Sequence, residues 1–315
     1  MASLPPPGEP TLIAALESAL AGVGLKTPVK SVRRADNVYE SSHRSDVLAC
    51  TLASGAELTL LGKVGPSVDQ DHWGLVRGLA YEAGVYRHVL VDDDPTPRFY
   101  GSHDDPRTGR TWLFLEYLGE GWQLDLGPED AIVEAARMIG ELHSRTAPTL
   151  GAESPSVLNR YDGRYYEDCV RNVGPLVEKW RPRLPALDRL VAGFQREFAV
   201  LLSAPQTIVH GELTPHNVVW AYDRPYIVDW EEAAIGAGEV DLASLTDDWD
   251  EDLVSLATTA YLQSRWPEGA PHDFPRALRA ARVFWLFRWL ADADGADSEE
   301  GIDWLAERLD EAAGP

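Results

Sequence analysis

The stretch that decides the fold runs from Ile208 to Trp230 and reads I-V-H-G-E-L-T-P-H-N-V-V-W-A-Y-D-R-P-Y-I-V-D-W. Two short apolar runs flank a polar turn, and a tight turn at Tyr222–Pro225 precedes a last apolar run that delivers an acid. This pattern predicts a short β-hairpin-like unit with a polar loop before it and a carboxylate after it. We expect Glu212, Asn217 and Asp229 at one end of that unit.

These three side chains form a set that suits phosphoryl transfer. The carboxylate of Glu212 can accept a proton, while the amide oxygen of Asn217 and the carboxylate of Asp229 can hold a hard metal such as Mg²⁺. Phosphoryl transfer needs a base that orients the acceptor hydroxyl and metal ligands that neutralise the phosphates. We therefore predict catalytic roles for Glu212, Asn217 and Asp229, and metal binding for Asn217 and Asp229.

Composition and length describe an ordinary soluble protein. The chain has 315 residues, of which 44% are hydrophobic and 25% charged, which suits about two globular domains. No apolar run approaches the ~20 residues that span a bilayer, and the Pro-rich start does not resemble a secretory signal. Cys50 and Cys169 have no paired spacing, so we expect neither a disulfide framework nor a zinc site, and a cytoplasmic location.

The net charge of −23 argues against nucleic acid as a partner, because no basic stripe is present to neutralise phosphates. An acidic surface can concentrate a cationic substrate, and the acidic run from Asp247 to Asp252 is one place where it would do so. The alternative is that this acidity serves solubility and that the run is a solvated loop. Membrane partners are not expected.

Predicted strands gather before residue 118 and predicted helices after it. Strands are expected at 47–52, 57–64 and 111–118, with helices at 11–21 and 75–90. Helical spacing then dominates, over 131–143, 160–172, 174–180, 185–202, 239–245, 253–266 and 275–291. The predicted organisation is a β-rich N-terminal lobe at 1–117 and a helical C-terminal lobe at 118–315.

Three features of the first lobe suit a nucleotide. Lys63 ends a strand and Glu82 lies in the next helix, where an ion pair would fix the ammonium toward a phosphate. Ser41 and Ser42 belong to a polar turn that could cover phosphates, although no Gly-rich motif accompanies them. The strand that ends at Glu116, Tyr117 and Leu118 could present backbone groups to an adenine edge. The alternatives are a solvated lysine and a surface glutamate.

Three motifs together resemble the aminoglycoside phosphotransferase family of kinase-like enzymes. The first is H-G-E-L-T-P-H-N at 210–217, the second is V-D-W-E at 228–231, and the third is G-A-G-E-V-D-L-A at 236–243. With Lys63 and Glu82 in order upstream, the resemblance extends from about residue 45 to about residue 290. It implies an α+β, protein-kinase-like bilobal fold with a small β-rich N-lobe and a larger, mostly helical C-lobe.

The resemblance also implies a role for each position. Lys63 would contact the α- and β-phosphates of ATP or GTP, and residues 116–118 would form the nucleotide hinge. Asn217 and Asp229 would bind Mg²⁺, and Asp241 would hold the catalytic turn through its backbone. His210 would be a structural histidine, and Glu231 would be either a contact near the metal or a solvated acid.

Glu212 departs from the family pattern, because the family usually has Asp there. Its carboxylate reaches ~1.5 Å further, and placement errors of ~1 Å can cost ~10²-fold in rate. The resemblance implies transfer of the γ-phosphate to a hydroxyl of a small molecule such as an aminoglycoside, another antibiotic or a sugar. Two alternatives stay open: a Ser/Thr kinase acting on a precursor peptide with a partner lyase, and a catalytically weak nucleotide-binding scaffold.

Overall fold

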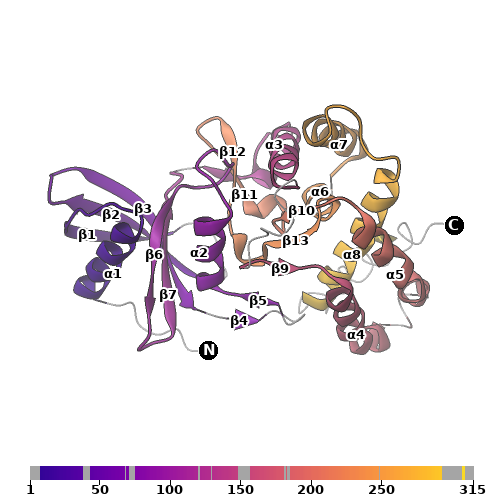
Figure 1. Cartoon of the computed structure of the whole chain (residues 1–315), viewed down its shortest axis with the longest axis horizontal. Coiled ribbons are helices and arrows are strands. Elements are labelled where there is room, and N and C mark those ends of the chain that lie inside the picture. Colours follow the sequence, from indigo (N-terminus) through magenta and orange to yellow (C-terminus); the bar gives the residue numbers. More distant parts are fainter. Residues whose placement is uncertain are drawn as a thin grey trace. The chain divides into compact units, whose positions relative to one another are not determined.

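The computed structural model describes residues 8–37, 43–67, 69–70, 75–119, 121–128, 130–147, 157–180, 182, 185–247, 249–292 and 307–308. Backbone contacts divide the chain into two compact units, whose elements are labelled in Figure 1. Unit 1 comprises 1–70, 76–121 and 226–231, and unit 2 comprises 71–75, 122–225 and 232–315. The predicted α+β class is confirmed, since unit 1 is built on a sheet and unit 2 is mostly helical.

Unit 1 is organised around one antiparallel five-stranded sheet with the order β1-β2-β3-β7-β6. Its strands are β1 (Val29–Asp36), β2 (Arg44–Leu52), β3 (Glu57–Pro66), β6 (Phe99–Asp105) and β7 (Arg110–Glu116). A short pair, β4 (Asp69–Gln70) and β5 (Val76–Arg77), lies apart from this sheet. The sequence prediction missed β1 and β6, because these edge strands are rich in polar residues and lack a clean apolar alternation.

The two helices of unit 1 cover opposite faces of this sheet (Figure 1). Helix α1 (Glu9–Gly22) packs Leu12 and Leu16 against a cluster that includes Leu60 and Val64 of β3. Side chains alternate along a strand, so Lys63 points to the other face, which α2 (Leu79–His88) covers. The apolar pattern of β3 thereby places one lysine beneath α2, away from the α1 core.

A glycine at the edge of the sheet allows α1 to pack closely. Gly101 lies at an irregularity in the pairing of β6 with β7 and has a φ of 114°, a conformation that side chains rarely adopt. A Cβ atom at this position would lie 2.2 Å from the backbone oxygen of Ala19 in α1. The helix can therefore rest on β6 only because residue 101 lacks a side chain.

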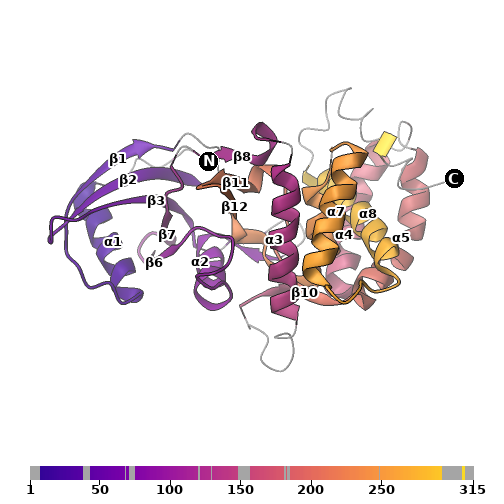
Figure 2. The same ribbon diagram turned by 90° about the horizontal axis from the view of Figure 1, so that it is seen from above.

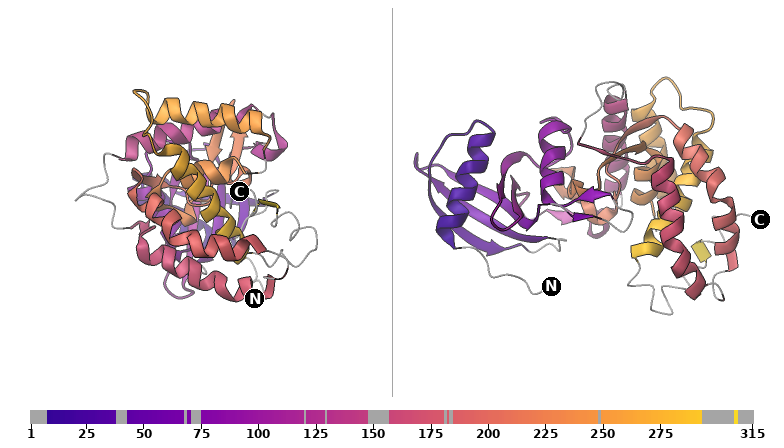
Figure 3. Two further views of the ribbon diagram at one scale, coloured as in Figure 1. Left: turned by 90° about the vertical axis from the view of Figure 1, so that its right-hand side faces the viewer. Right: turned by 60° about the horizontal axis from the view of Figure 1, so that its bottom comes forward.

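Unit 2 contains most of the helices in the described part of the chain, together with two small sheets. The helices are α3 (Ala131–Thr146), α4 (Gly163–Trp180), α5 (Pro185–Ser203), α6 (Glu239–Leu245), α7 (Glu251–Arg265) and α8 (Phe274–Asp292). Helix α3 runs beside α7, as Figure 2 shows, and α8 packs with α4 and α5, the yellow and rose helices of Figure 3. Residues 283–288 of α8 are all buried, so this helix forms part of the core of unit 2.

The two small sheets, formed largely by unit 2, carry the functional turns. The first has the order β10-β13-β9, with β10 (Gln206–Val209), β13 (Ala234–Ala237) and β9 (Asn159–Arg160). The second has the order β12-β11-β8, with β8 (Trp122–Gln123), β11 (Val218–Ala221) and β12 (Arg224–Ile227). Single 3-10 turns occur at η1 (Leu124–Leu126), η3 (Pro215–Asn217) and η4 (Trp230–Glu232). The predicted hairpin is confirmed for β11 and β12, whose two-residue loop has positive φ angles at Tyr222 and Asp223, as such a tight turn requires.

Two predictions around α4 are wrong. The two helices expected at 160–172 and 174–180 form the single helix α4, which runs without a break through Gly174. A glycine inside a helix costs about 1 kcal/mol and a proline about 3 kcal/mol relative to alanine, and α4 contains both Gly174 and Pro175. The packing of α4 against α5 and α8 offsets this local cost. Residue 160, expected in a helix, lies instead in β9.

We predict that Gly101→Ala will lower the free energy of unfolding by about 3 kcal/mol, because the new side chain adds a clash with α1 to backbone strain. Gly109→Ala is the matched control, since Gly109 also has a positive φ but nothing within 4 Å of the point that a Cβ atom would occupy. It should lose only about 1–2 kcal/mol. Urea unfolding measures both, and equal losses would contradict the close packing of α1 on β6.

Candidate functional site

The centre of unit 1 is a lysine held between two carboxylates. The ammonium of Lys63 donates to Glu82 Oε1 and Oε2 at 3.0 and 3.2 Å, and to Asp229 Oδ1 at 2.8 Å. Lys63 is only 4% exposed and Glu82 is fully buried. The predicted Lys63–Glu82 ion pair is therefore present, and the alternatives of a solvated lysine and a surface glutamate are wrong. The sequence did not predict that Asp229 would be the third member.

Burial and the neighbouring opposite charge shift the pKa of Lys63, and that of Glu82, in opposite directions. Burial raises the pKa of Glu82, Lys63 lowers it and Asp229 raises it again, with a net value of about 7. Burial acts to lower the pKa of Lys63, but the two carboxylates outweigh it and raise that pKa above its ordinary value. Lys63 is therefore a permanent cation, faced by two acids.

Asp229 is held in an unusual backbone conformation. Its φ is 66°, in the left-handed region that costs a residue with a side chain of order 1 kcal/mol. Neighbouring contacts support it: Ile227 N–H donates to the oxygen of Pro95 at 2.6 Å, and the buried Trp230 ring donates to the oxygen of Ile227 at 3.1 Å. This conformation directs a carboxylate, about 20% exposed, onto the ammonium of Lys63. Non-glycine residues held in this region cluster at functional sites.

A second pair of unit 1 was not predicted. His43 Nε2 lies 3.0 Å from Glu231 Oε2, and both side chains are largely buried. Burial lowers the pKa of His43, but the hydrogen bond and charge of Glu231 raise it more, so the net pKa lies above its ordinary value. Glu231 is therefore no solvated acid. Ser41 and Ser42, predicted to cover phosphates, lie outside the described residues.

The predicted hinge follows the end of β7. Glu116 and Arg98 hold each other: the N–H of Arg98 donates to the Glu116 carboxylate at 3.1 Å, and the N–H of Glu116 donates to the oxygen of Arg98 at 2.8 Å. Within the described part of the chain, no hydrogen bond engages the backbone of Tyr117 or Leu118. These contacts with Arg98 fix Glu116 at the end of β7. The backbone N–H and C=O groups of Tyr117 and Leu118 are then available to bind a ligand.

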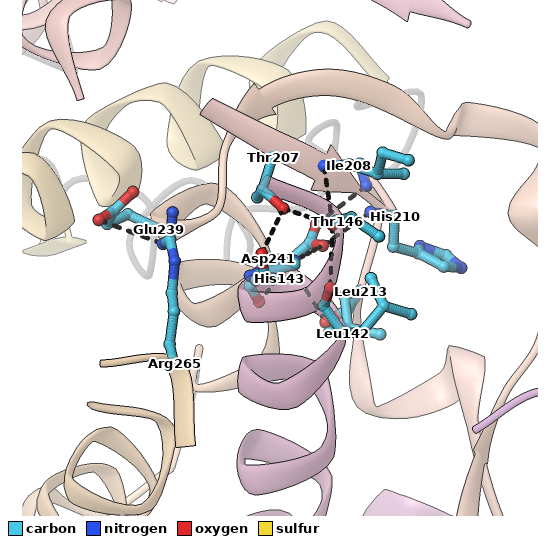
Figure 4. A network of polar contacts seen from close by, with 12 residues as sticks. Leu142, His143, Thr146, Thr207, Ile208, His210, Leu213, Glu239, Asp241 and Arg265 are labelled. Carbon is cyan, nitrogen blue, oxygen red and sulfur yellow. Dashed lines mark hydrogen bonds and ion pairs between the residues drawn. The ribbon is translucent and has the colours of Figure 1, made fainter. Parts of the chain in front are cut away.

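In unit 2, residues 210–217 form a turn whose peptide groups are fixed; we call it the 210–217 turn. Asp241 accepts from the N–H of His210 at 2.7 Å and from the N–H of Gly211 at 2.9 Å, as the close-up in Figure 4 shows in part. The predicted role of Asp241 as holder of this turn is confirmed. The N–H of Glu212 donates to His210 Nδ1 at 3.3 Å, which agrees with a structural histidine.

Asn217 closes the same turn. Its Nδ2 donates to the backbone oxygen of Glu212 at 2.9 Å, and that oxygen also accepts from the N–H of Thr214 at 2.8 Å. Because the amide nitrogen is engaged, the orientation of the Asn217 side chain is set. Its Oδ1 accepts no hydrogen bond from the described residues. A half-buried, oriented amide oxygen is a suitable ligand for a hard cation.

A buried polar network supports Asp241 from behind. His143 Nε2 lies 3.2 Å from Asp241 Oδ2, and His143 Nδ1 lies 3.0 Å from the hydroxyl of Tyr261. Arg265 donates to that hydroxyl at 2.5 Å. It also pairs with Glu239 at 3.4 Å, as Figure 4 shows. Because the Asp241 carboxylate can only accept, the imidazole proton lies on Nε2, and in the neutral ring Nδ1 accepts from the Tyr261 hydroxyl.

The protonation of His143 agrees with this arrangement. Burial lowers its pKa first, the charge of Arg265 lowers it further, and Asp241 raises it, with a net pKa below the ordinary value. The imidazole is therefore neutral near pH 7. Sequence reasoning missed His143, Tyr261 and Arg265 because their only signal is spatial: they come from two helices that are distant in sequence.

The acidic run at 247–252 has structural partners. Asp247 accepts from the Trp285 indole at 3.0 Å and pairs with Arg308 at 3.2 Å. Asp250 caps α7 by accepting from the N–H of Leu253 at 3.0 Å. Within the described ranges, no cluster of three or more His, Cys, Asp or Glu residues could hold a metal ion. No helix among them is long and apolar enough to cross a membrane.

Comparison with known proteins places the chain among phosphotransferases. The model of the phosphotransferase enzyme family matches residues 71–272, more than half of the chain. No curated protein sequence matches it. The structure resembles a choline/ethanolamine kinase family protein from Mesorhizobium loti, with 14% identity, a TM-score of 0.57, and coverage of 97% of this chain and 95% of that chain.

Two phosphotransferases solved with ADP share the same fold. Spectinomycin phosphotransferase, solved with ADP and spectinomycin, is 11% identical with a TM-score of 0.60, and 98% of each chain is covered. A thermostable mutant of an aminoglycoside phosphotransferase, solved with ADP and hygromycin B, is 16% identical with a TM-score of 0.54, covering 91% of this chain and 94% of that chain. These likenesses confirm the predicted protein-kinase-like fold.

The neutral, buried His143 predicts a loss of stability in acid. The unfolded chain protonates this histidine near pH 6.5, whereas the folded protein resists protonation, so the unfolded state binds more protons below that pH. The free energy of unfolding should therefore fall as the pH drops below 6.5, by at most about 1.4 kcal/mol per pH unit from this group.

Urea unfolding at several pH values checks this expectation. In His143→Gln the free energy of unfolding should fall less steeply below pH 6.5 than it does in the wild type. His88→Gln is the control, because His88 is exposed on α2. An unchanged slope in His143→Gln would show that the histidine is protonated in the folded protein as well.

Proposed function

This chain belongs to the phosphotransferase enzyme family, and we propose that it transfers the γ-phosphate of ATP or GTP to a hydroxyl group of a small molecule. The observation that carries the proposal is the buried contact of Lys63 with Glu82 and Asp229. Burying one cation with two acids is costly for a structural purpose alone. Phosphoryl transfer accounts for it, since the reaction needs a fixed cation and a carboxylate ligand.

The nucleotide roles follow from the contacts of unit 1. We assign the α- and β-phosphates to Lys63, whose ammonium is oriented by Glu82 and whose contact with Asp229 can be exchanged for phosphate oxygens. The free backbone groups of Tyr117 and Leu118 suit the edge of a purine, next to the anchored Glu116. The complexes of two similar enzymes with ADP support nucleotide use.

Magnesium fits the donors that the chain provides. Asn217 offers an oriented amide oxygen that accepts no hydrogen bond from the described residues. Asp229 offers a carboxylate whose direction is set by the left-handed backbone conformation of that residue. Oxygen donors of these two kinds are those that Mg²⁺ prefers. When bound, the ion would neutralise the phosphate charge. We therefore assign Asn217 and Asp229 as its protein ligands.

Glu212 is the proposed base. The acceptor hydroxyl forms a new bond to the γ-phosphorus, the bond from that phosphorus to the β-phosphate oxygen breaks, and the hydroxyl proton passes to the Glu212 carboxylate. The products are a phosphate monoester and the nucleoside diphosphate. The backbone of Glu212 is fixed at its N–H and its oxygen, so the longer side chain extends from a rigid point.

The acceptor is proposed only by class. The net charge of −23 suits a cationic, hydroxyl-bearing compound. Spectinomycin and hygromycin B, bound by two similar enzymes, are compounds of that kind. The acidic run at 247–252 does not support an acceptor role, because Asp247 and Asp250 serve local contacts.

We predict MgATP- or MgGTP-dependent phosphorylation of at least one compound in a panel of spectinomycin, hygromycin B, choline, ethanolamine and a serine-containing peptide. Asp229→Asn should lower kcat/KM by at least about 10²-fold, because the metal loses a charged ligand. Asparagine tolerates the left-handed backbone, so the fold should survive. Asp223→Asn, on the hairpin loop, is the control and should match the wild type. Turnover that survives Asp229→Asn would refute the metal assignment.

Glu212 variants distinguish an enzyme from a nucleotide-binding scaffold. Glu212→Gln should lower kcat by about 10²-fold or more, and Glu212→Asp should also lower it, because the carboxylate is withdrawn by ~1.5 Å. Nucleotide affinity, measured by calorimetry, should stay unchanged in both. A scaffold gives the opposite pattern: the wild type binds nucleotide without transfer, and Glu212→Asp gains activity.

A further inference from the structure

Arg288 is a buried cation in the apolar part of α8. It is 3% exposed, and its neighbours from Val283 to Phe287 are all buried hydrophobic residues. One terminal nitrogen donates to the backbone oxygen of Gly211 at 2.5 Å and to the Tyr161 hydroxyl at 3.2 Å. The other donates to Glu232 Oε2 at 3.3 Å. The side chain thus connects α8 to the residue that precedes Glu212.

The bond to Gly211 completes the fixation of one peptide group. The oxygen of the peptide that joins Gly211 to Glu212 accepts from Arg288, and the N–H of the same peptide donates to His210 Nδ1. The preceding peptide N–H is held by Asp241. Because the Cα atom of Glu212 belongs to the fixed peptide plane, Arg288 helps to fix the point from which the Glu212 side chain leaves the backbone.

Gly211 is shaped for this contact. Its φ is 89°, and a Cβ atom would lie 2.4 Å from the backbone oxygen of Glu232 and 2.6 Å from the Tyr161 hydroxyl. These two residues are the ones that Arg288 also binds. The glycine therefore lets its carbonyl approach a cluster that would exclude any larger residue.

The charge of Arg288 reaches Glu212 as well. Burial acts to lower the pKa of Arg288, but Tyr161, Tyr165, Glu232 and Glu212 raise it well above its ordinary value. Arg288 Nε is buried and makes no hydrogen bond in the described chain. A methionine would fill such a place in an apolar helix without the cost of a buried charge. Packing alone does not explain an arginine here.

We propose that Arg288 is a positioning residue that orients Glu212 for proton acceptance by holding the Gly211 carbonyl. The proposal rests on the assignment of Glu212 as the base. The contacts support this role. Arg288 donates to a carbonyl oxygen of the turn, while Asp241 accepts from two of its N–H groups. Glu232 balances the buried charge.

Steady-state kinetics of four proteins test the proposal: wild type, Arg288→Lys, the double variant Arg288→Met/Glu232→Gln, and Arg279→Met. The double variant removes both buried charges together, so neither is left unpaired. Arg279 lies on the same helix, is half-exposed and pairs with Glu197, which makes it the matched control. kcat and KM are measured with MgATP or MgGTP and the acceptor that the panel identifies, and nucleotide stoichiometry by calorimetry gives the folded fraction.

We expect the double variant to lose about 10²-fold in kcat per folded molecule, with KM for the nucleotide unchanged, as for a ~1 Å misplacement of the base. Arg288→Lys keeps the charge but not the planar fork, so its loss should be smaller. Arg279→Met should match the wild type. Amide exchange of residues 210–212 should be faster in the double variant alone.

Two results would overturn the proposal. One is an unchanged kcat per folded molecule in the double variant, with only the melting temperature lowered, which would assign Arg288 a purely structural role. The other is unchanged amide exchange at residues 210–212, which would show that Arg288 does not hold the turn. If the wild type transfers phosphate to no acceptor, the proposed function fails, and the exchange measurement still decides whether Arg288 fixes the turn.

Discussion

The pairing of buried charge is the constraint on which the functional parts of both units depend. A buried ammonium or carboxylate is tolerated only where opposite charges or hydrogen bonds compensate its lost hydration. In unit 1 this requirement connects Lys63 to α2 through Glu82 and to the segment after β12 through Asp229. The sheet, the helix and a distant segment of the chain are thereby held in one arrangement. A nucleotide phosphate would meet a cation whose position is already fixed, so little reorganisation is needed when it binds.

The same constraint operates in unit 2 through backbone groups. In the 210–217 turn, Asp241 accepts from the N–H groups of His210 and Gly211, and Arg288 donates to the carbonyl of Gly211. Each of these buried charges has its own partner, His143 for the aspartate and Glu232 for the arginine. Because buried charged groups hold this turn on both its N–H and its carbonyl side, the turn has a single low-energy arrangement. A base on such a turn keeps its direction before the substrate binds. A fixed backbone matters for Glu212, because a long side chain is harder to place precisely.

Local patterns account well for the elements that could be predicted. The strands β2, β3 and β7 have continuous apolar runs, and the long helices repeat their apolar residues at helical spacing, so their existence follows from burial. The polar edge strands β1 and β6 were missed, because they pair with neighbours through backbone hydrogen bonds that leave no mark on side-chain identity. Among the site residues, Lys63 and Glu82 could be paired in advance, since a strand followed by a helix limits where each side chain can point.

The sequence by itself determined the family, the chemistry of the donor set and the identity of the turn residues, because motif spacing places those side chains on short, local elements. Only the tertiary structure decided which groups are buried together: that Asp229 joins Lys63, that His43 meets Glu231, and that Arg288 holds Gly211. Each of these contacts joins segments that are far apart in the chain. Their formation depends on the packing of whole elements, and no local spacing of residues records that packing.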